Sequence, residues 1–151
     1  MIKVNVEINS KRWHKKIKNP KKYFIRKLNK ISKIVKFFKN KNITFTILLT
    51  NSLNVKKLNA KFRKRNKSTD VLSFPSFSTK HLKLIKEKNI YIGDIAASYE
   101  IVNSRARKKN FYSEFDKVWI HGLLHLVGYD HIKNRDYYKM NIIEKRILNS
   151  I

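Results

Sequence analysis

Alternation of apolar and polar residues at the N-terminus predicts the first element of the chain. In residues 2–8 the apolar side chains fall at every second position, as in a strand with one buried face. Residues 21–39 instead repeat their apolar positions with a period close to 3.6, which predicts an amphipathic helix with Pro20 in its first turn. A β-branched run at 43–49 predicts a second strand, and helical spacing returns at 51–65. The first half is therefore expected to run β, α, β, α.

The second half begins with two short apolar runs and continues with helical patterns. Residues 69–77 and 90–97 are predicted strands, joined by a long, exposed, lysine-rich loop. A capping box at Ser113, with Asp116 three residues on, predicts the start of a buried helix that Gly128 ends. Further helices are expected at 99–108 and after Asn134 or Asp136, the last with an apolar stripe of Tyr138, Ile142, Ile143 and Ile147. The predicted order, β-α-β-α-β-β-α-α-α, is that of an α+β fold with about four strands.

Length and composition limit the class of protein. A chain of 151 residues suits a single domain, 1–151, and its hydrophobic residues, 42% of the total, nowhere form a run long enough to cross a bilayer. The alternating N-terminus lacks the apolar core of a secretory signal, so a soluble, cytoplasmic protein is expected. Since the chain has no cysteine, disulfide-linked partners, thiolate nucleophiles and sulfur-based metal sites are excluded.

The charge of the chain is extreme, with 36 Lys and Arg against 10 Asp and Glu, a formal net charge of +26. Such a field attracts polyanions, above all nucleic acid. Codon bias in an A/T-rich genome, which would enrich lysine, asparagine and isoleucine together, explains much of the excess equally well. Charge alone therefore leaves the choice between a functional basic surface and solvated lysines open.

Three of the five histidines lie within the segment HGLLHLVGYDH, residues 121–131. His121 and His125 are four residues apart on a helix that is otherwise apolar nearly all round, so both imidazoles can reach one point. A shared metal would remove the cost of burying two imidazoles without partners. The turn at Gly128 would bring in His131 as the third ligand. Three neutral imidazoles leave one tetrahedral position for water, as in catalytic zinc sites.

Neighbouring residues support a cation here and limit the reaction. The window 118–132 contains neither Lys nor Arg, and Asp130 is a candidate for orienting a ligand imidazole. HExxH peptidases need a glutamate after the first histidine as general base, and Gly122 stands there, so phosphodiester cleavage is favoured over peptide hydrolysis. His14 and His81 lie among lysines and are expected to be exposed. His-only ligation suits zinc but also copper, nickel and iron.

The segment HGLLHLVGYDH resembles the signature of the YbeY endoribonucleases, the ribosomal RNA maturation factors of bacteria. Further blocks resemble that family's central segment and its following strand, in the same order: Leu58-Asn59, Phe62-Arg63, STDVLSFP at 68–75 and IGDI at 92–95. The resemblance implies a compact α+β fold with a small mixed sheet beside helices. It also implies one zinc ion per chain on His121, His125 and His131, and cleavage of single-stranded RNA in maturation of the small-subunit rRNA 3′ end and in ribosome quality control.

Arg63 takes its functional role from the same resemblance. A guanidinium near the metal could bind the scissile phosphate and offset charge in the transition state, so Arg63 and His121 are the candidate catalytic residues. Residues 73–75 are expected to form a floor beside the site. The sequence departs from the family pattern at Ser68, where proline is frequent, and in the basic loop 80–88, and neither departure touches the proposed metal site.

Two hypotheses account for these features. The first is a zinc-dependent endoribonuclease whose general base is open and whose nucleophile is either water or the neighbouring ribose 2′-hydroxyl. The second is an RNA- or ribosome-binding assembly factor whose metal is mainly structural. An all-histidine set of three ligands, which leaves a coordination position open, favours the enzyme. The expected partners are single-stranded RNA, ribosomal RNA and ribosomes, without a membrane.

Overall fold

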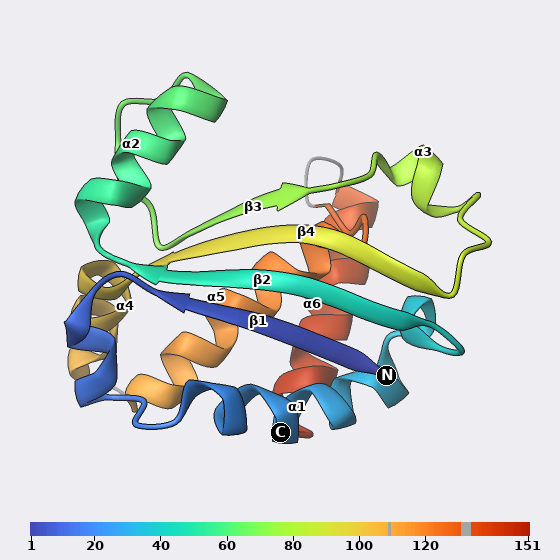
Figure 1. Cartoon of the computed structure of the whole chain (residues 1–151), viewed down its shortest axis with the longest axis horizontal. Helices are drawn as coiled ribbons and strands as arrows, with labels where there is room; N and C mark the ends of the chain where they lie inside the picture. The colour runs from blue at the N-terminus through green and yellow to red at the C-terminus, as the bar shows by residue number, and fades with distance from the viewer. Residues whose placement is uncertain (109, 131–133) are drawn as a thin grey trace.

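Four strands form the sheet: β1 (Ile2–Ile8), β2 (Asn42–Thr50), β3 (Val71–Pro75) and β4 (Asn89–Ser98). They come from a computed structural model, which describes residues 1–108, 110–130 and 134–151. The strand order is β1-β2-β4-β3, with β1, β2 and β4 parallel and the edge strand β3 antiparallel to β4 (Figure 1). The α+β class and the mixed sheet are therefore confirmed.

The helices lie on both faces of this sheet. They are α1 (Pro20–Ile34), α2 (Ser52–Arg63), α3 (Thr79–Leu82), α4 (Tyr99–Arg105), α5 (Phe111–Leu126) and α6 (Asn134–Leu148), with 3-10 turns at Lys11–Lys15, Lys36–Phe38 and Ala106–Lys108. Helices α1, α5 and α6 cover one face, whereas α2 stands on the other (Figure 1). Within the described ranges, no helix has the length and apolarity needed to cross a membrane.

Strand alternation determines which side chains fill each layer. In β1 the polar side chains are exposed and the apolar ones are buried or half-buried, and in β2 four apolar side chains at alternate positions are buried against α1, α5 and α6. Val55, Leu72 and Ala96 form a smaller cluster on the opposite face, under α2. Neighbouring residues of β3 consequently face different layers, and this directs Ser73 toward α5 and Phe74 toward α2.

The start of α5 differs from the prediction. The helix begins at Phe111, because the Asn110 side chain caps it by accepting a hydrogen bond from the backbone N–H of Tyr112. The capping box predicted at Ser113 is therefore wrong. Its carboxylate, Asp116, is instead buried and accepts hydrogen bonds from other elements, as described below.

Two other helices end or turn differently from the sequence pattern. Helix α1 ends at Ile34 because Val35 has an extended backbone, and the apolar period continues only through the following 3-10 turn. In α6 the buried side chains are Met140 and Ile147, whereas Tyr138 and Ile142 of the predicted stripe are 66% and 63% exposed. That stripe was wrong at both positions, because the two overlapping sets of apolar residues cannot both face the core.

An irregularity in β4 lies beside the edge strand. Between the pairs Thr44–Tyr91 and Thr46–Asp94, β4 has one more residue than β2. Gly93 lies in this bulge with φ +129°, and a Cβ there would come within 2.2 Å of the Phe74 carbonyl oxygen. Only glycine allows β3 to approach β4 this closely with that backbone conformation.

Candidate metal and RNA site

Helix α5 places two histidines side by side at the wall of a cleft. His121 and His125 are half-buried, and their Nε2 atoms lie 3.1 Å apart. Two ligands of one tetrahedral zinc, each about 2.05 Å from the ion, are separated by about 3.3 Å. The convergence predicted from the spacing is therefore present, and the observed separation fits two ligands of a single ion.

The third predicted ligand, His131, lies outside the described residues, so the three-histidine site stays a prediction. Within the ranges that the structure covers, no cluster of three or more His, Asp or Glu with metal-site geometry is present. The helix does end where the sequence indicates. Gly128 has φ +86°, its backbone N–H donates to His125, and the N–H of Tyr129 donates to Leu124.

A carboxylate that no sequence pattern marks contacts His121. Glu144 of α6 places Oε1 2.7 Å from His121 Nδ1, and both side chains are partly buried. An Nδ1–H donor to this carboxylate leaves the Nε2 lone pair directed into the cleft, toward His125. Asp130, the carboxylate predicted for this orienting task, lines the same cleft. No sequence signal marks Glu144, because its direction depends on how α6 is rotated about its axis.

Arg63 reaches the same cleft from the other side of the sheet. It is the last residue of α2, and Lys64, with φ 58°, ends the helix there. One guanidinium nitrogen of Arg63 donates to the Ser73 carbonyl oxygen at 2.7 Å. A guanidinium has five N–H donors, so this bond fixes the group at the edge of β3 while leaving donors for an anion.

Asn59 organises the loop that follows Arg63. It is 3% exposed, and its side-chain amide donates to the Lys67 carbonyl oxygen at 2.7 Å. The backbone carbonyl oxygen of Asn59 accepts hydrogen bonds from the backbone N–H groups of Lys64 and Arg65. The motif Leu58-Asn59 did not predict that Asn59 links the end of α2 to Lys67.

The predicted floor is present in part. Ser73 and Pro75 line the cleft, and the Ser73 hydroxyl donates to the Gly122 carbonyl oxygen at 3.1 Å. Phe74 points to the other face and packs against Phe62, with ring centroids 5.4 Å apart. It is not part of the floor, since alternate residues of a strand face opposite sides.

Gly122 is the point where α5 touches the sheet. A Cβ on Gly122 would lie 3.1 Å from Ile95 Cγ2 and Ser73 Oγ, and 3.2 Å from Val71 Cγ2. A glutamate at this position would have to enter the packed layer between α5 and β3 rather than the cleft. The structure thus gives a steric reason, beyond the missing carboxylate, why the HExxH peptidase arrangement does not fit.

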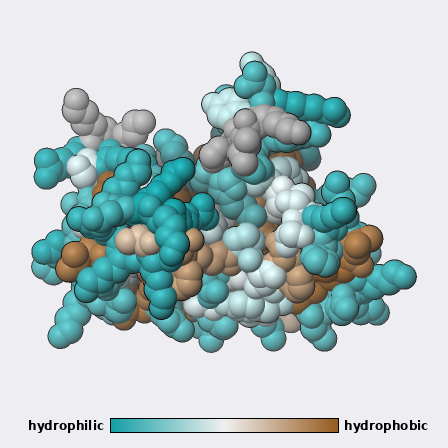
Figure 2. All heavy atoms as spheres, turned by 90° about the horizontal axis from the view of Figure 1, so that it is seen from above, coloured by the Kyte–Doolittle hydropathy of each residue, from teal (hydrophilic) through white to brown (hydrophobic). Residues whose placement is uncertain are grey.

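The cleft has a volume of about 1080 Å³ and mixed charge. Asp70 pairs with Arg105, and Glu114 pairs with Lys117 at 3.9 Å. Four further cations that line it have no carboxylate partner among the residues placed by the structure: Arg63, Arg65, Lys67 and Lys145. Seen from above, the surface is hydrophilic over most of its extent (Figure 2). The unpaired cations give the cleft an excess of positive charge that suits an anionic ligand.

The two histidines outside the candidate site lie where the sequence predicts. His14 and His81 are exposed, as predicted, and neither lines the cleft. Burial raises the pKa of Tyr129, a residue of the cleft wall, above the ordinary tyrosine value.

Comparisons with known proteins agree with the resemblance seen in the sequence. A family model described as Endoribonuclease YbeY matches residues 6–151. A Pelagibacter ubique protein of that description is 46% identical over 145 residues, covering 93% of this chain and 90% of the relative. One from Ehrlichia canis is 34% identical over 153 residues, covering 100% and 93%. A Thermotoga maritima protein solved in solution matches with a TM-score of 0.60 at 27% identity, covering 99% of this chain and 88% of that one.

Proposed function

Because this chain belongs to the YbeY family of endoribonucleases, we propose that it is a zinc-dependent enzyme that cuts single-stranded RNA in the cytoplasm. Its proposed tasks are maturation of the small-subunit rRNA 3′ end and ribosome quality control, with residues 1–151 acting as one catalytic domain. The observation that carries the proposal is the convergence of the His121 and His125 Nε2 atoms in a cleft whose rim carries Arg63.

One zinc ion is proposed to bind His121, His125 and His131. When bound, it would supply a Lewis acid for the phosphodiester and lower the pKa of water at the site. Glu144 would hold His121 in the tautomer that presents Nε2 to the cleft, because its carboxylate accepts the Nδ1 proton. Asp130 precedes His131 directly in the chain, and it is proposed to orient the imidazole of a metal ligand in the same way.

Arg63 is proposed to bind the scissile phosphate. Its guanidinium is fixed at one corner by the Ser73 carbonyl, so its remaining N–H donors keep a constant direction toward the cleft. Donors that are already oriented stabilise the charge that develops on the phosphate without reorganising during the reaction. Arg63 therefore contributes to substrate binding and to the chemical step.

Cleavage of a single-stranded ribosomal RNA fragment tests the proposal. Chelation should abolish cleavage and added zinc should restore it, and Arg63→Ala should lower kcat/KM by roughly 10²- to 10³-fold, the usual effect of removing one transition-state donor. Arg146→Ala, an exposed cation of α6 that does not line the cleft, should cut like wild type. Equal losses in both variants would show that only net charge matters.

Metal content separates the enzyme from an assembly factor with a structural metal. Elemental analysis should find about one zinc per wild-type chain and less than a tenth of that in His121→Ala or His125→Ala, with His14→Ala unchanged. In an enzyme these variants stay folded and lose cleavage. Unfolding of both, together with RNA binding but no cleavage by zinc-loaded wild type, would favour the assembly factor.

A single 2′-deoxy residue at the mapped cleavage site identifies the nucleophile. If the neighbouring ribose 2′-hydroxyl attacks phosphorus, the substituted RNA stays intact and the normal product carries a 2′,3′-cyclic phosphate or its hydrolysed form. If water attacks, the substituted RNA is still cut at that site. Both outcomes are compatible with the proposed endoribonuclease.

A further inference from the structure

A second concavity, of about 810 Å³, lies between α1 and the start of α5 and is named here the α1 groove. Of its 13 lining residues, seven are Lys or Arg and none is Asp or Glu. The cleft, in contrast, includes four carboxylates in its wall. The charged side chains that line the α1 groove are thus all positive, which suits an anion, whereas the cleft has mixed charge.

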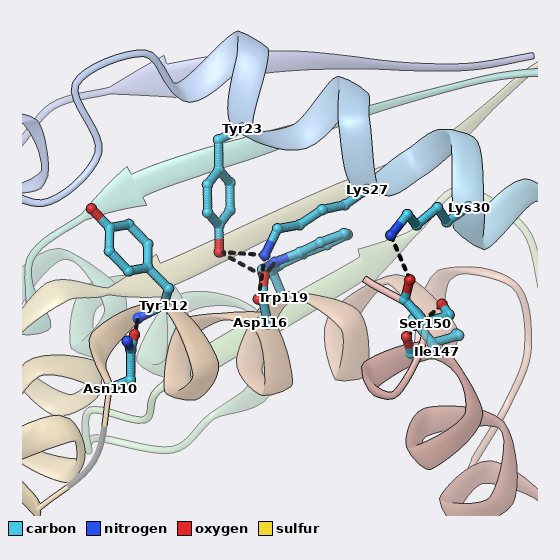
Figure 3. Close-up of polar contacts among 9 residues, drawn as sticks. All are labelled: Tyr23, Lys27, Lys30, Asn110, Tyr112, Asp116, Trp119, Ile147 and Ser150. Atoms are coloured by element: carbon cyan, nitrogen blue, oxygen red, sulfur yellow. Dashed lines mark hydrogen bonds and ion pairs between the residues drawn. The ribbon is translucent and has the colours of Figure 1, made fainter.

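The carboxylate beneath the groove does not cancel this charge. Asp116 of α5 is 6% exposed and forms an ion pair with Lys27. It also accepts hydrogen bonds from the Tyr23 hydroxyl at 2.6 Å and from Trp119 Nε1 at 2.9 Å, as Figure 3 shows. Asp116 therefore neutralises one lysine only. The other six cations of the groove have no carboxylate partner among the described residues.

An aromatic ring lies among these cations. Tyr112 is 46% exposed, and its hydroxyl donates to the Lys16 carbonyl oxygen at 2.7 Å, which holds the ring at the edge of the groove. Its ring is tilted by 33° against Tyr23 at a centroid distance of 6.0 Å. Nucleic-acid bases stack on such exposed rings while neighbouring cations contact the phosphates, a combination typical of single-strand binding.

The groove and the cleft lie on opposite sides of α5. Tyr112 and Asp116 face α1, whereas Lys117 and His121 line the cleft. Tyr112 and His125 are thirteen residues apart, which corresponds to about 20 Å along the helix axis. An RNA of about three nucleotides, roughly 10 Å of stacked strand, is too short to occupy both.

We propose that the α1 groove is a second RNA-binding site, which holds the sugar–phosphate backbone and one stacked base of a strand whose other part is cut in the cleft. The inference rests on the proposed function, because RNA is chosen as the polyanion on the basis of the endoribonuclease activity. It predicts that long RNA is bound and cut better than short RNA.

Two triple variants with the same change in charge test the proposal. Lys18→Gln/Lys22→Gln/Arg26→Gln removes three exposed cations of the α1 groove. Lys33→Gln/Lys36→Gln/Lys86→Gln removes three exposed cations that line neither the α1 groove nor the cleft. A charge-preserving variant, Lys18→Arg/Lys22→Arg, completes the set. Thermal unfolding followed by circular dichroism verifies that each variant is folded.

Binding is measured by fluorescence anisotropy with a 20-nucleotide, 2′-O-methyl single-stranded RNA that gels show to stay intact. The groove variant should bind at least about tenfold more weakly at low salt, and its slope of log affinity against log NaCl should fall by roughly 2, at about 0.7 per lost phosphate contact. The control triple should change the slope by well under half of that, and the arginine variant should bind like wild type. Equal effects of both triples would overturn the proposal in favour of a diffuse basic surface.

Substitution of Tyr112 tests the stacked base. Tyr112→Ala should weaken binding about tenfold, whereas Tyr112→Phe should retain it, since stacking needs the ring and not the hydroxyl. Wild-type affinity in Tyr112→Ala would overturn the stacking part.

Cleavage separates a failure of this inference from a failure of the proposed function. The groove triple should lower kcat/KM for a 20-nucleotide RNA and leave cleavage of a trinucleotide unchanged. If wild type cuts RNA and both triples cut the long substrate equally well, the groove proposal fails and the activity stands. If wild type cuts no RNA but the triples still differ in binding, the activity fails and the groove stands.

Discussion

At the scale of single residues, Glu144 contacts the Nδ1 atom of His121, a proposed metal ligand, at 2.7 Å. Loss of a carboxylate behind a ligand imidazole typically lowers metal affinity 10- to 100-fold. We therefore expect Glu144→Ala to weaken zinc binding by roughly that factor, measured by competition with a chelating dye. Asp130→Ala measures the sequence-predicted alternative in the same assay, and the exposed Glu87→Ala is the control. Wild-type zinc affinity in Glu144→Ala would contradict the role assigned to the 2.7 Å contact.

Tyr23 gives a pH-dependent prediction at the same scale. The Tyr23 pKa lies well above its ordinary value of 10.0. Burial is the largest cause, and the negative charge of Asp116 and the hydrogen bond to it add to the shift. The stability that depends on the protonated hydroxyl is fully present below about pH 10 and is lost as the pH rises above it. At pH 8, Tyr23→Phe should cost about 1–3 kcal/mol, the usual cost of losing a hydrogen bond to a charged group.

The difference between wild type and Tyr23→Phe should narrow between about pH 10 and pH 12, because only wild type must keep this phenol protonated in order to fold. Urea unfolding at a series of pH values measures it. Tyr137→Phe, at a position 52% exposed, should follow the wild-type curve. A difference between wild type and Tyr23→Phe that stays constant up to pH 12 would contradict the argument.

At the scale of elements, the bulge of β4 determines how closely β3 can pair with it. Gly93→Ala would place a methyl group 2.2 Å from the Phe74 carbonyl oxygen at a φ that L-residues rarely adopt. We expect a loss of at least about 2 kcal/mol in the free energy of unfolding. Gly128 has a positive φ as well, but a Cβ there would meet only a flexible methyl group of Leu82 at 3.1 Å. Gly128→Ala should therefore lower the free energy of unfolding by about 1 kcal/mol. Equal losses of unfolding free energy in the two variants, measured by denaturant unfolding, would show that the φ angle and not the contact with Phe74 determines the cost.

Elements set by local alternation could be predicted from the sequence, whereas those set by tertiary contacts could not. β1 was expected at residues 2–8 and spans Ile2–Ile8, because its period of two has one interpretation. The start of α5 was missed because Asn110, not Ser113, caps the helix, and the carboxylate of the predicted capping box, Asp116, accepts hydrogen bonds from Tyr23 and Trp119. The pairing of His121 with His125 follows from helix geometry within α5. Glu144 could not be found, since α6 contains two overlapping apolar stripes and only packing selects the buried one.

At the scale of the whole molecule, a formal net charge of +26 acts on folding and on RNA binding with opposite salt dependence. Among the described residues, Lys and Arg form four side-chain ion pairs, so most of the 36 basic residues repel one another. Salt screens this repulsion, because the Debye length of the solution falls to about 10 Å at an ionic strength of 0.1 M. We therefore expect the melting temperature to rise between low salt and about 0.3 M NaCl while RNA affinity falls. A melting temperature that falls over this range would contradict the repulsion argument.

The contact between Glu144 and His121 also has a consequence for the time order in which the site is completed. Helix α5 leaves the ribosome during synthesis before α6 does, and the two helices meet through this hydrogen bond. Glu144 follows His121 by 23 positions in the chain, and until it has emerged His121 lacks this contact. In a newly made chain the proposed site is therefore complete only after α6 has left the ribosome and packed against α5.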